Sequence, residues 1–215
     1  MELLETLRST GAVRGFTDAT VSDATIASVL ETASFAPSGG NRQPWKVAVV
    51  KDHGLRNTLA GLMRPVWQEY CGANAVGRRP FAFGKSIDAP PVATPNALID
   101  DIASVPVVLA IAANLQEIAI MDGNLDRPPI VGGASIYPFC WSIVLAARAH
   151  GLGGVITTFL SRAEPGAAGP LRLPANHALA ATIFLGVPTH QNTKLRRNPV
   201  NSFAFVDGFD GKSLQ

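Results

Sequence analysis

Several features that would assign this chain to a familiar class are scarce in it. It has only two cysteines, Cys71 and Cys140, and neither belongs to a CxxC or Cys/His spacing, so a disulfide framework and a zinc site both lose support. The longest apolar run, Val105 to Ala113, is about half the length of a membrane-spanning helix. The start, MELLETLRST, carries acidic residues where a secretory signal carries basic ones. We therefore expect a soluble, cytoplasmic protein.

The sequence also has no cluster of charges of one sign. The chain has a net charge of +2, but its lysines and arginines are scattered without a run of like charge, which gives no footprint for nucleic acid. Its 215 residues are 47% hydrophobic and 16% charged, enough for one sizeable core. We expect a single domain over residues 1–215 that acts on small molecules.

The usual catalytic motifs are absent as well. The glycines of residues 151–154 follow a helix and lead into a strand, which is the reverse of a dinucleotide-binding turn, and Gly84-Lys85-Ser86 lacks the first glycine of a P-loop. The four histidines show no metal-ligand spacing, and neither Ser38 nor Ser135 lies in a GxSxG motif. If the protein is an enzyme, a cofactor should carry its chemistry.

What the chain does contain is a clear alternation of helices and strands. Hydrophobic periodicity predicts helices at residues 2–8, 55–70 and 135–150, and one that starts with Ser22 as the cap and ends where Ala36 precedes Pro37. Strands are predicted at residues 46–50, 105–113, 153–159 and 178–187. The second and fourth strands are apolar on both faces, so we expect them at the centre of a sheet.

Three segments stand out from this pattern. Residues 72–96 have no periodicity but contain four prolines and several aromatics, and we interpret them as a functional flap. The helix at 135–150 is apolar nearly all round, which predicts burial on every side, as in a dimer core. From Leu195 onward the chain resembles an extended arm.

The loop APSGGNRQPW, residues 36–45, is longer than a helix-to-strand connection requires. Gly39 and Gly40 let the backbone approach a flat ligand closely, while Ser38, Asn41 and Gln43 offer hydrogen-bonding groups to the edge of a heterocycle. The alternative is a helix terminator followed by a polar surface loop, with a tryptophan packed at the start of the strand.

These elements together resemble the nitroreductase family of FMN-dependent oxidoreductases. The resemblance lies in Arg14-x-Phe16, the APSGGNRQPW loop, LAARAHGLGG at 145–154, LGVP at 185–188 and Arg196-Arg197, and it covers about residues 4–200. It implies an α+β fold, a nitroreductase-like three-layer α/β/α sandwich with a mixed, mostly antiparallel central sheet, in an intertwined homodimer. The specific element is the APSGGNRQPW loop.

The resemblance also implies which residues bind FMN. Arginines from both ends of the chain would bind the phosphate, although this sequence has Thr10-Gly11-Ala12 where many members carry a basic residue and a serine. For each arginine, and for Ile136 and Tyr137, a solubilising or core role is the alternative. The implied FMN-binding residues are Arg14, Pro37, Ser38, Gly39, Asn41, Gln43, Ser135, Ile136, Tyr137, Thr157, Thr158, Arg196 and Arg197.

The implied activity is transfer of hydride from NADH or NADPH to an electron-poor acceptor, such as a nitroaromatic, a quinone or a conjugated carbonyl, by a ping-pong mechanism. No residue needs to act as acid or base, so we predict no catalytic side chain and no metal. An acceptor could be sandwiched by Trp67, Tyr70, Phe81 and Phe83, whose alternative role is packing. The alternatives are a narrower flavin enzyme, such as a reductive dehalogenase, and a protein that binds FMN without turnover.

Overall fold

A computed structural model describes residues 2–81 and 89–214 of the chain. Its helices are α1 (Leu3–Ser9), α2 (Asp23–Ala33), α3 (His53–Ala75), α4 (Ala97–Asp100), α5 (Tyr137–Ala149), α6 (Phe159–Arg162) and α7 (Glu164–Leu171). Its strands are β1 (Trp45–Val49), β2 (Val107–Asn114), β3 (Gly153–Thr157) and β4 (His177–Gly186). Five short 3₁₀ turns, among them η1 (Gly39–Asn41), η3 (Leu115–Glu117) and η4 (Val131–Ser135), complete the described elements.

The four strands form one antiparallel sheet in the order β1-β2-β4-β3. Strands β2 and β4 are central, as their doubly apolar sequences predict, and residues of β2 are buried at every position but the last. The edge strands of the sheet are therefore β1 and β3. The loop before β1 lies at one edge, and the segment after β3 lies at the other.

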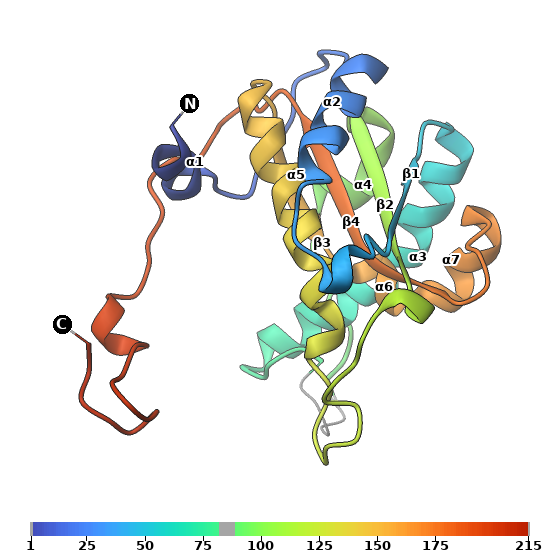
Figure 1. The fold of residues 1–215 in the computed structure, drawn as a ribbon. Helices are drawn as coiled ribbons and strands as arrows, with labels where there is room; N and C mark the ends of the chain where they lie inside the picture. The colour runs from blue at the N-terminus through green and yellow to red at the C-terminus, as the bar shows by residue number, and fades with distance from the viewer. Residues whose placement is uncertain (1, 82–88, 215) are drawn as a thin grey trace.

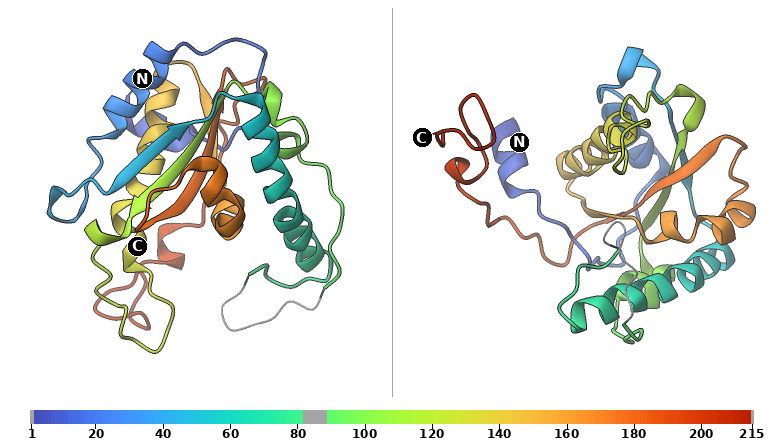
Figure 2. Two further views of the ribbon diagram at one scale, coloured as in Figure 1. Left: turned by 90° about the vertical axis from the view of Figure 1, so that its right-hand side faces the viewer. Right: turned by 90° about the horizontal axis from the view of Figure 1, so that it is seen from below.

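Helices cover both faces of this sheet (Figures 1 and 2), which confirms the predicted three-layer α+β arrangement. Helices α2 and α5 pack on one face, and α3, α4, α6 and α7 lie on the other. Ser22 caps α2 as expected, because its hydroxyl accepts a hydrogen bond from the Thr25 N–H.

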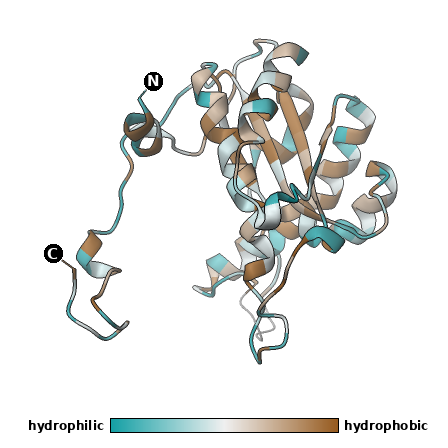
Figure 3. Cartoon of the chain, viewed as in Figure 1, coloured by the Kyte–Doolittle hydropathy of each residue, from teal (hydrophilic) through white to brown (hydrophobic). Residues whose placement is uncertain are grey.

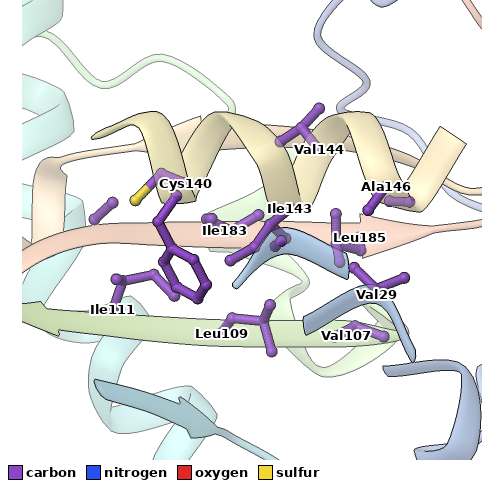
Figure 4. Packing of buried hydrophobic residues seen from close by; sticks show 14 of the residues in the cluster. Val29, Val107, Leu109, Ile111, Cys140, Ile143, Val144, Ala146, Ile183 and Leu185 are labelled. Carbon is purple, nitrogen blue, oxygen red and sulfur yellow. The ribbon is translucent and has the colours of Figure 1, made fainter. Parts of the chain in front are cut away.

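Helix α5 supplies the largest part of the first face (Figure 4). Ile143 of this helix points toward β2 and β4, and both Ile143 and Val144 are almost fully buried in the core of their own chain. The rings of Trp45 and Phe139 stack with centroids 4.4 Å apart and join β1 to the same helix. The prediction that α5 is buried on every side does not hold within one chain, since Tyr137 and Trp141 are exposed on its outer side.

Helix α3 continues beyond its predicted end near residue 70, so the expected flap does not begin at Gly72. Gly72 lies inside α3, and a Cβ placed on it would clash with the Pro90 carbonyl oxygen. The glycine therefore lets the backbone near Pro90 pack closely against the helix and does not mark the start of a loop. The described residues 89–96, at the far end of the predicted flap, contain no helix or strand.

Helices α6 and α7 are absent from the sequence-based prediction. They span residues 159–171, where Pro165, Pro170 and two glycines hide any helical period, and α7 is only eight residues long. A proline is tolerated near the start of α7 because the first helical residues need no N–H partner within the helix.

The two termini lie away from the sheet (Figure 1). After residue 190 the chain extends outward, with one 3₁₀ turn at Val200–Ser202, and α1 lies near the start of this arm. Both segments carry exposed apolar side chains, and Figure 3 colours much of α1 as hydrophobic. In the described part of the chain, no helix is both long enough and apolar enough to cross a membrane.

Candidate functional site

The loop between α2 and β1 adopts an unusual backbone. Gly40, Asn41 and Gln43 have φ angles of 60°, 52° and 48°, and the last two are left-handed without being glycine. Two side chains hold this shape, because the Ser38 hydroxyl accepts from the Gln43 N–H and the Ser135 hydroxyl accepts from the Gly39 N–H, both at 3.0 Å. The loop is thus fixed by its own hydrogen bonds.

This geometry changes the expected use of the polar side chains. The Gln43 side-chain amide donates to Asn41 Oδ1 at 3.2 Å, so these two side chains form a hydrogen bond with each other that was expected to go to a ligand. A pocket of about 440 Å³ opens beside the loop instead, along Pro37 to Gly40 and Arg42. Its opposite wall is formed by Glu117, Ala119, Met121, Val131, Ala134 and Ser135.

A second pocket, of about 600 Å³, brings Arg14 together with the adjacent residues Thr157 and Thr158, which lie far from Arg14 in the sequence. Arg14 is exposed, and within residues 2–81 and 89–214 its guanidinium makes no hydrogen bond or ion pair. The Thr157 hydroxyl donates to the Thr182 carbonyl at 3.4 Å and so faces the sheet. Contacts from Thr157 to a ligand would therefore have to come from its backbone.

The edge of β3 near this pocket has unpaired backbone groups. The Gly154 carbonyl points outward and accepts from the Val13 N–H at 2.9 Å. Because backbone groups alternate along a strand, the N–H of Ile156 points outward too. This edge can donate to a ligand without any side-chain rearrangement.

Of the four predicted aromatic residues, two line this pocket and Phe81 lies beside it, partly exposed. Trp67 and Tyr70 line the pocket and stack on each other with centroids 5.6 Å apart. Phe81 packs against Tyr70 and lies 4.4 Å from the guanidinium carbon of Arg162, an arrangement that supports its alternative role in packing. The predicted Phe83 lies outside the described residues.

Ile136 and Tyr137 also differ from each other. Ile136 is fully buried in the core, which supports its alternative role, while the Tyr137 hydroxyl donates to the Ala180 carbonyl at 3.4 Å. Both residues line a third, apolar pocket of about 500 Å³. Among the described residues that line this third pocket there is neither Arg14 nor Pro37 and Ser38.

The two ends of the chain meet beside Arg14. The Gln191 amide donates to the Gly11 carbonyl at 3.1 Å, and a Cβ on Gly11 would lie 2.9 Å from the Leu195 side chain. Leu195, which contacts Gly11, is followed by Arg196, and the Arg197 guanidinium donates to the Arg196 carbonyl at 2.7 Å. Neither arginine is among the described residues that line the pocket of Arg14. The sequence Thr10-Gly11-Ala12, which replaces the basic residue and serine of many family members, thus allows the arm to pack closely against the N-terminal segment.

Two candidate residues were missed by the sequence-based prediction. Asn96 lines the pocket with Arg14, and its side chain caps α4 by accepting from the Leu98 N–H. The signal was Asn96, the last residue of the segment interpreted as a flap, followed directly by a short helical turn, ALID. Arg42, the other residue, lies 3.9 Å from Glu117 across the first pocket.

A hydrogen bond to a carboxylate holds Asn96 in place at the edge of the second pocket. The Asn96 N–H donates to Asp100 at 2.7 Å, and this bond, together with that from Arg64, holds the pKa of Asp100 below its usual value. Over residues 2–81 and 89–214, no three His, Cys, Asp or Glu side chains come together as a metal site.

Comparison with known proteins agrees with this fold. The family model described as "Nitroreductase family" matches residues 7–187. Among proteins, a 59-residue segment, 27% of this chain, is 39% identical to a provisionally named NADH dehydrogenase/NAD(P)H nitroreductase from Archaeoglobus fulgidus. The match spans about a third (34%) of that relative.

Solved structures share the fold along nearly the whole chain. A provisionally named nitroreductase from Desulfovibrio desulfuricans, in complex with FMN, has a TM-score of 0.70 and 20% identity, with 97% of this chain and 98% of that chain covered. The NADPH:FMN oxidoreductase from Vibrio harveyi, complexed with NAD⁺, has a TM-score of 0.69 and 18% identity, with 96% and 77% covered. On the strength of the family match, this chain belongs to the nitroreductase family.

Proposed function

We propose that the protein is an FMN-dependent oxidoreductase. The chemistry that FMN supplies when bound is the ping-pong transfer of hydride from NADH or NADPH to an electron-poor acceptor such as a nitroaromatic, a quinone or a conjugated carbonyl. Family membership supports this proposal, as do the FMN and NAD⁺ bound in the two similar structures. The whole chain, residues 1–215, would act as one domain.

The observation that carries the proposal is the pocket of about 600 Å³ around Arg14. A flavin mononucleotide needs a cation for its phosphate, backbone donors for its ring edge and a flat apolar surface beside it. Arg14 is the exposed cation, the edge of β3 has an outward N–H at Ile156, and Trp67 provides a flat surface. The residues present fit the group.

The loop of residues 37–43 supports a site shared by two chains. It precedes β1, whereas Thr157 ends β3, and these strands are the two edges of the sheet. Three strand spacings separate them, which is about 14 Å. One ring could contact both groups only if a second copy of the chain brings its own loop to the Arg14 pocket, so we propose a homodimer with FMN at the interface.

An absorbance spectrum of the purified protein tests the proposal. We expect a yellow protein that holds one FMN per chain, loses its colour when NADH or NADPH is added under argon, and regains it with a suitable acceptor. Colour that persists with both nucleotides would favour an FMN-binding protein without turnover. A colourless protein that takes up no FMN would refute the proposal.

A screen of acceptors then defines the reaction. Nitroaromatics, quinones and conjugated carbonyls should restore the colour at different rates, and a halogenated aromatic compound tests the narrower reductive dehalogenase. Sedimentation velocity on the same sample tests the homodimer, because a stable monomer that retains FMN at micromolar concentration would contradict the shared site.

A further inference from the structure

Asp122 is a buried carboxylate in an otherwise exposed segment. It is 5% exposed, whereas Met121 before it is 84% exposed and Ile130 is 75% exposed. The segment between η3 and η4, residues 118–130, contains no helix or strand, so its shape depends on local contacts. A carboxylate is buried in such a place only when hydrogen bonds replace its water.

Three donors meet the Asp122 carboxylate. Arg127 Nη1 donates to Oδ2 at 2.7 Å, the Ile130 N–H donates to Oδ2 at 2.9 Å, and the Val131 N–H donates to Oδ1 at 3.3 Å. The bonds reach five, eight and nine residues along the chain. One side chain therefore closes residues 122–131 into a ring, which we call the latch loop.

The last residue of the latch loop, Val131, and the residue just before the loop, Met121, belong to one wall of the pocket beside the loop of residues 37–43. The ends of the wall are held separately, by the Arg42–Glu117 pair at one end and by the Gly39–Ser135 hydrogen bond at the other. The position of the middle depends on Asp122.

The chemistry of this pocket indicates what could enter it. Apart from Arg42 and Glu117, whose opposite charges lie 3.9 Å apart, the lining side chains are small or apolar. Such a wall presents no net charge and a flexible thioether at Met121. It suits an uncharged molecule with an apolar face and offers nothing to hold a strongly anionic one.

We propose that Asp122 is a positioning residue that fixes this apolar wall and thereby selects uncharged, apolar electron acceptors. The inference rests on the proposed function, because it places the acceptor beside the loop that would contact the flavin. Asp122 itself touches no substrate. Its effect passes through Met121 and Val131.

The test compares Asp122→Asn with Asp126→Asn, a matched change in the same segment at an exposed residue with no hydrogen bond in the described part of the chain. We expect Asp122→Asn to lower kcat/KM for menadione by about fivefold or more relative to ferricyanide, mainly through KM, while the FMN dissociation constant changes by less than about twofold. Asp126→Asn should behave like the unmodified protein. An unchanged ratio in Asp122→Asn would overturn the proposal.

Hydrogen exchange provides a reading that needs no flavin and no activity. At least one of the Ile130 and Val131 amides should exchange faster in Asp122→Asn, because asparagine has one acceptor oxygen where the carboxylate has two, and both amides should remain protected in Asp126→Asn. Equal protection in both variants would refute the latch even if the protein binds FMN. A protein that binds no FMN but shows the faster exchange would refute the proposed function and leave the latch standing.

A second variant guards against misfolding. Arg127→Met keeps both backbone bonds to Asp122 and removes the third, so it should shift the acceptor ratio in the same direction by a smaller factor. If Asp122→Asn does not fold, Arg127→Met decides, and a ratio equal to that of Asp126→Asn would count against the proposal.

Discussion

Single residues decide how the proposed site would hold a phosphate. Arg14 and Arg197 are exposed, and replacing both with alanine should weaken FMN binding more than riboflavin binding, because only FMN has the phosphate. Each lost charge-assisted hydrogen bond is worth roughly 1.5 to 3 kcal/mol. Fluorescence titration of both flavins measures the difference, and equal weakening would show that these arginines do not bind the phosphate.

Gly39 tests the loop at the same scale. A Cβ on Gly39 meets the Ser135 hydroxyl at 3.6 Å, an ordinary contact, so Gly39→Val should fold cooperatively and yet lose flavin, since its side chain would occupy ligand space. Gly61→Val is the control, because its side chain would enter open space. Thermal unfolding and flavin content decide: a variant that retains full flavin occupancy would remove Gly39 from the site.

Asn41 is less suitable for this test than the sequence suggested. Its φ of 52° is tolerated by asparagine but strained for alanine, and its side chain bonds to Gln43. A loss of flavin in Asn41→Ala would therefore combine backbone strain with lost contacts. The loop motif was readable from the sequence, whereas the direction of its polar side chains depended on φ angles that no pattern encodes.

At the scale of elements, α5 divides into an inner and an outer side. Ile143 and Val144 lie on the inner side, in the core of their own chain, so arginine at either position should unfold the chain and not merely separate a dimer. Trp141 is 39% exposed on the outer side. We predict that Trp141→Arg keeps the monomer folded and removes the dimer and its FMN together, as measured by circular dichroism, sedimentation and flavin content. A dimer that survives Trp141→Arg would place the interface elsewhere.

The buried side of α5 also carries a titratable group. Burial raises the pKa of Cys140 to about 12, above the value near 8.5 expected in the unfolded chain. The unfolded state therefore loses its thiol proton first as pH rises, so the stability contributed by the neutral thiol is complete below about pH 8.5 and declines above it by roughly 1.4 kcal/mol per pH unit.

Cys140→Ala isolates this effect. The difference in free energy of unfolding between the unmodified protein and Cys140→Ala should shrink between pH 8 and pH 10 in urea titrations, by about 1 to 2 kcal/mol. Cys71→Ala is the control, since Cys71 is only half-buried. A difference that stays constant over this range would mean that the thiolate is tolerated in the fold.

Elements were predictable in proportion to their periodicity. The four strands and the helices around residues 3–9, 23–33, 53–75 and 137–149 were found at nearly their observed places, because burial imposes a regular apolar pattern. Helices α6 and α7 were not, because their glycines and prolines are fixed by tertiary contacts such as that of Gly166 with Leu62. Asp122 was also invisible, since its three donors are set by the fold of the loop.

At the scale of the whole molecule, the sheet separates the two groups of proposed site residues. If two chains form two equivalent sites, each site takes its loop from one chain and its Arg14 pocket from the other. The consequence can be read by genetic complementation. A chain with Gly39→Val and a chain with Arg14→Ala and Arg197→Ala would each form inactive homodimers, but their heterodimer would combine both defects in one site and leave the other site intact.

Co-refolding equal amounts of the two inactive chains should then create activity that neither possesses. Random pairing makes half of the dimers mixed, each with one good site of two, so about a quarter of the unmodified activity and flavin content should return. Diluting one chain with the other should change the yield as the product of their fractions. A mixture no more active than the average of its parents would instead place each complete site within a single chain.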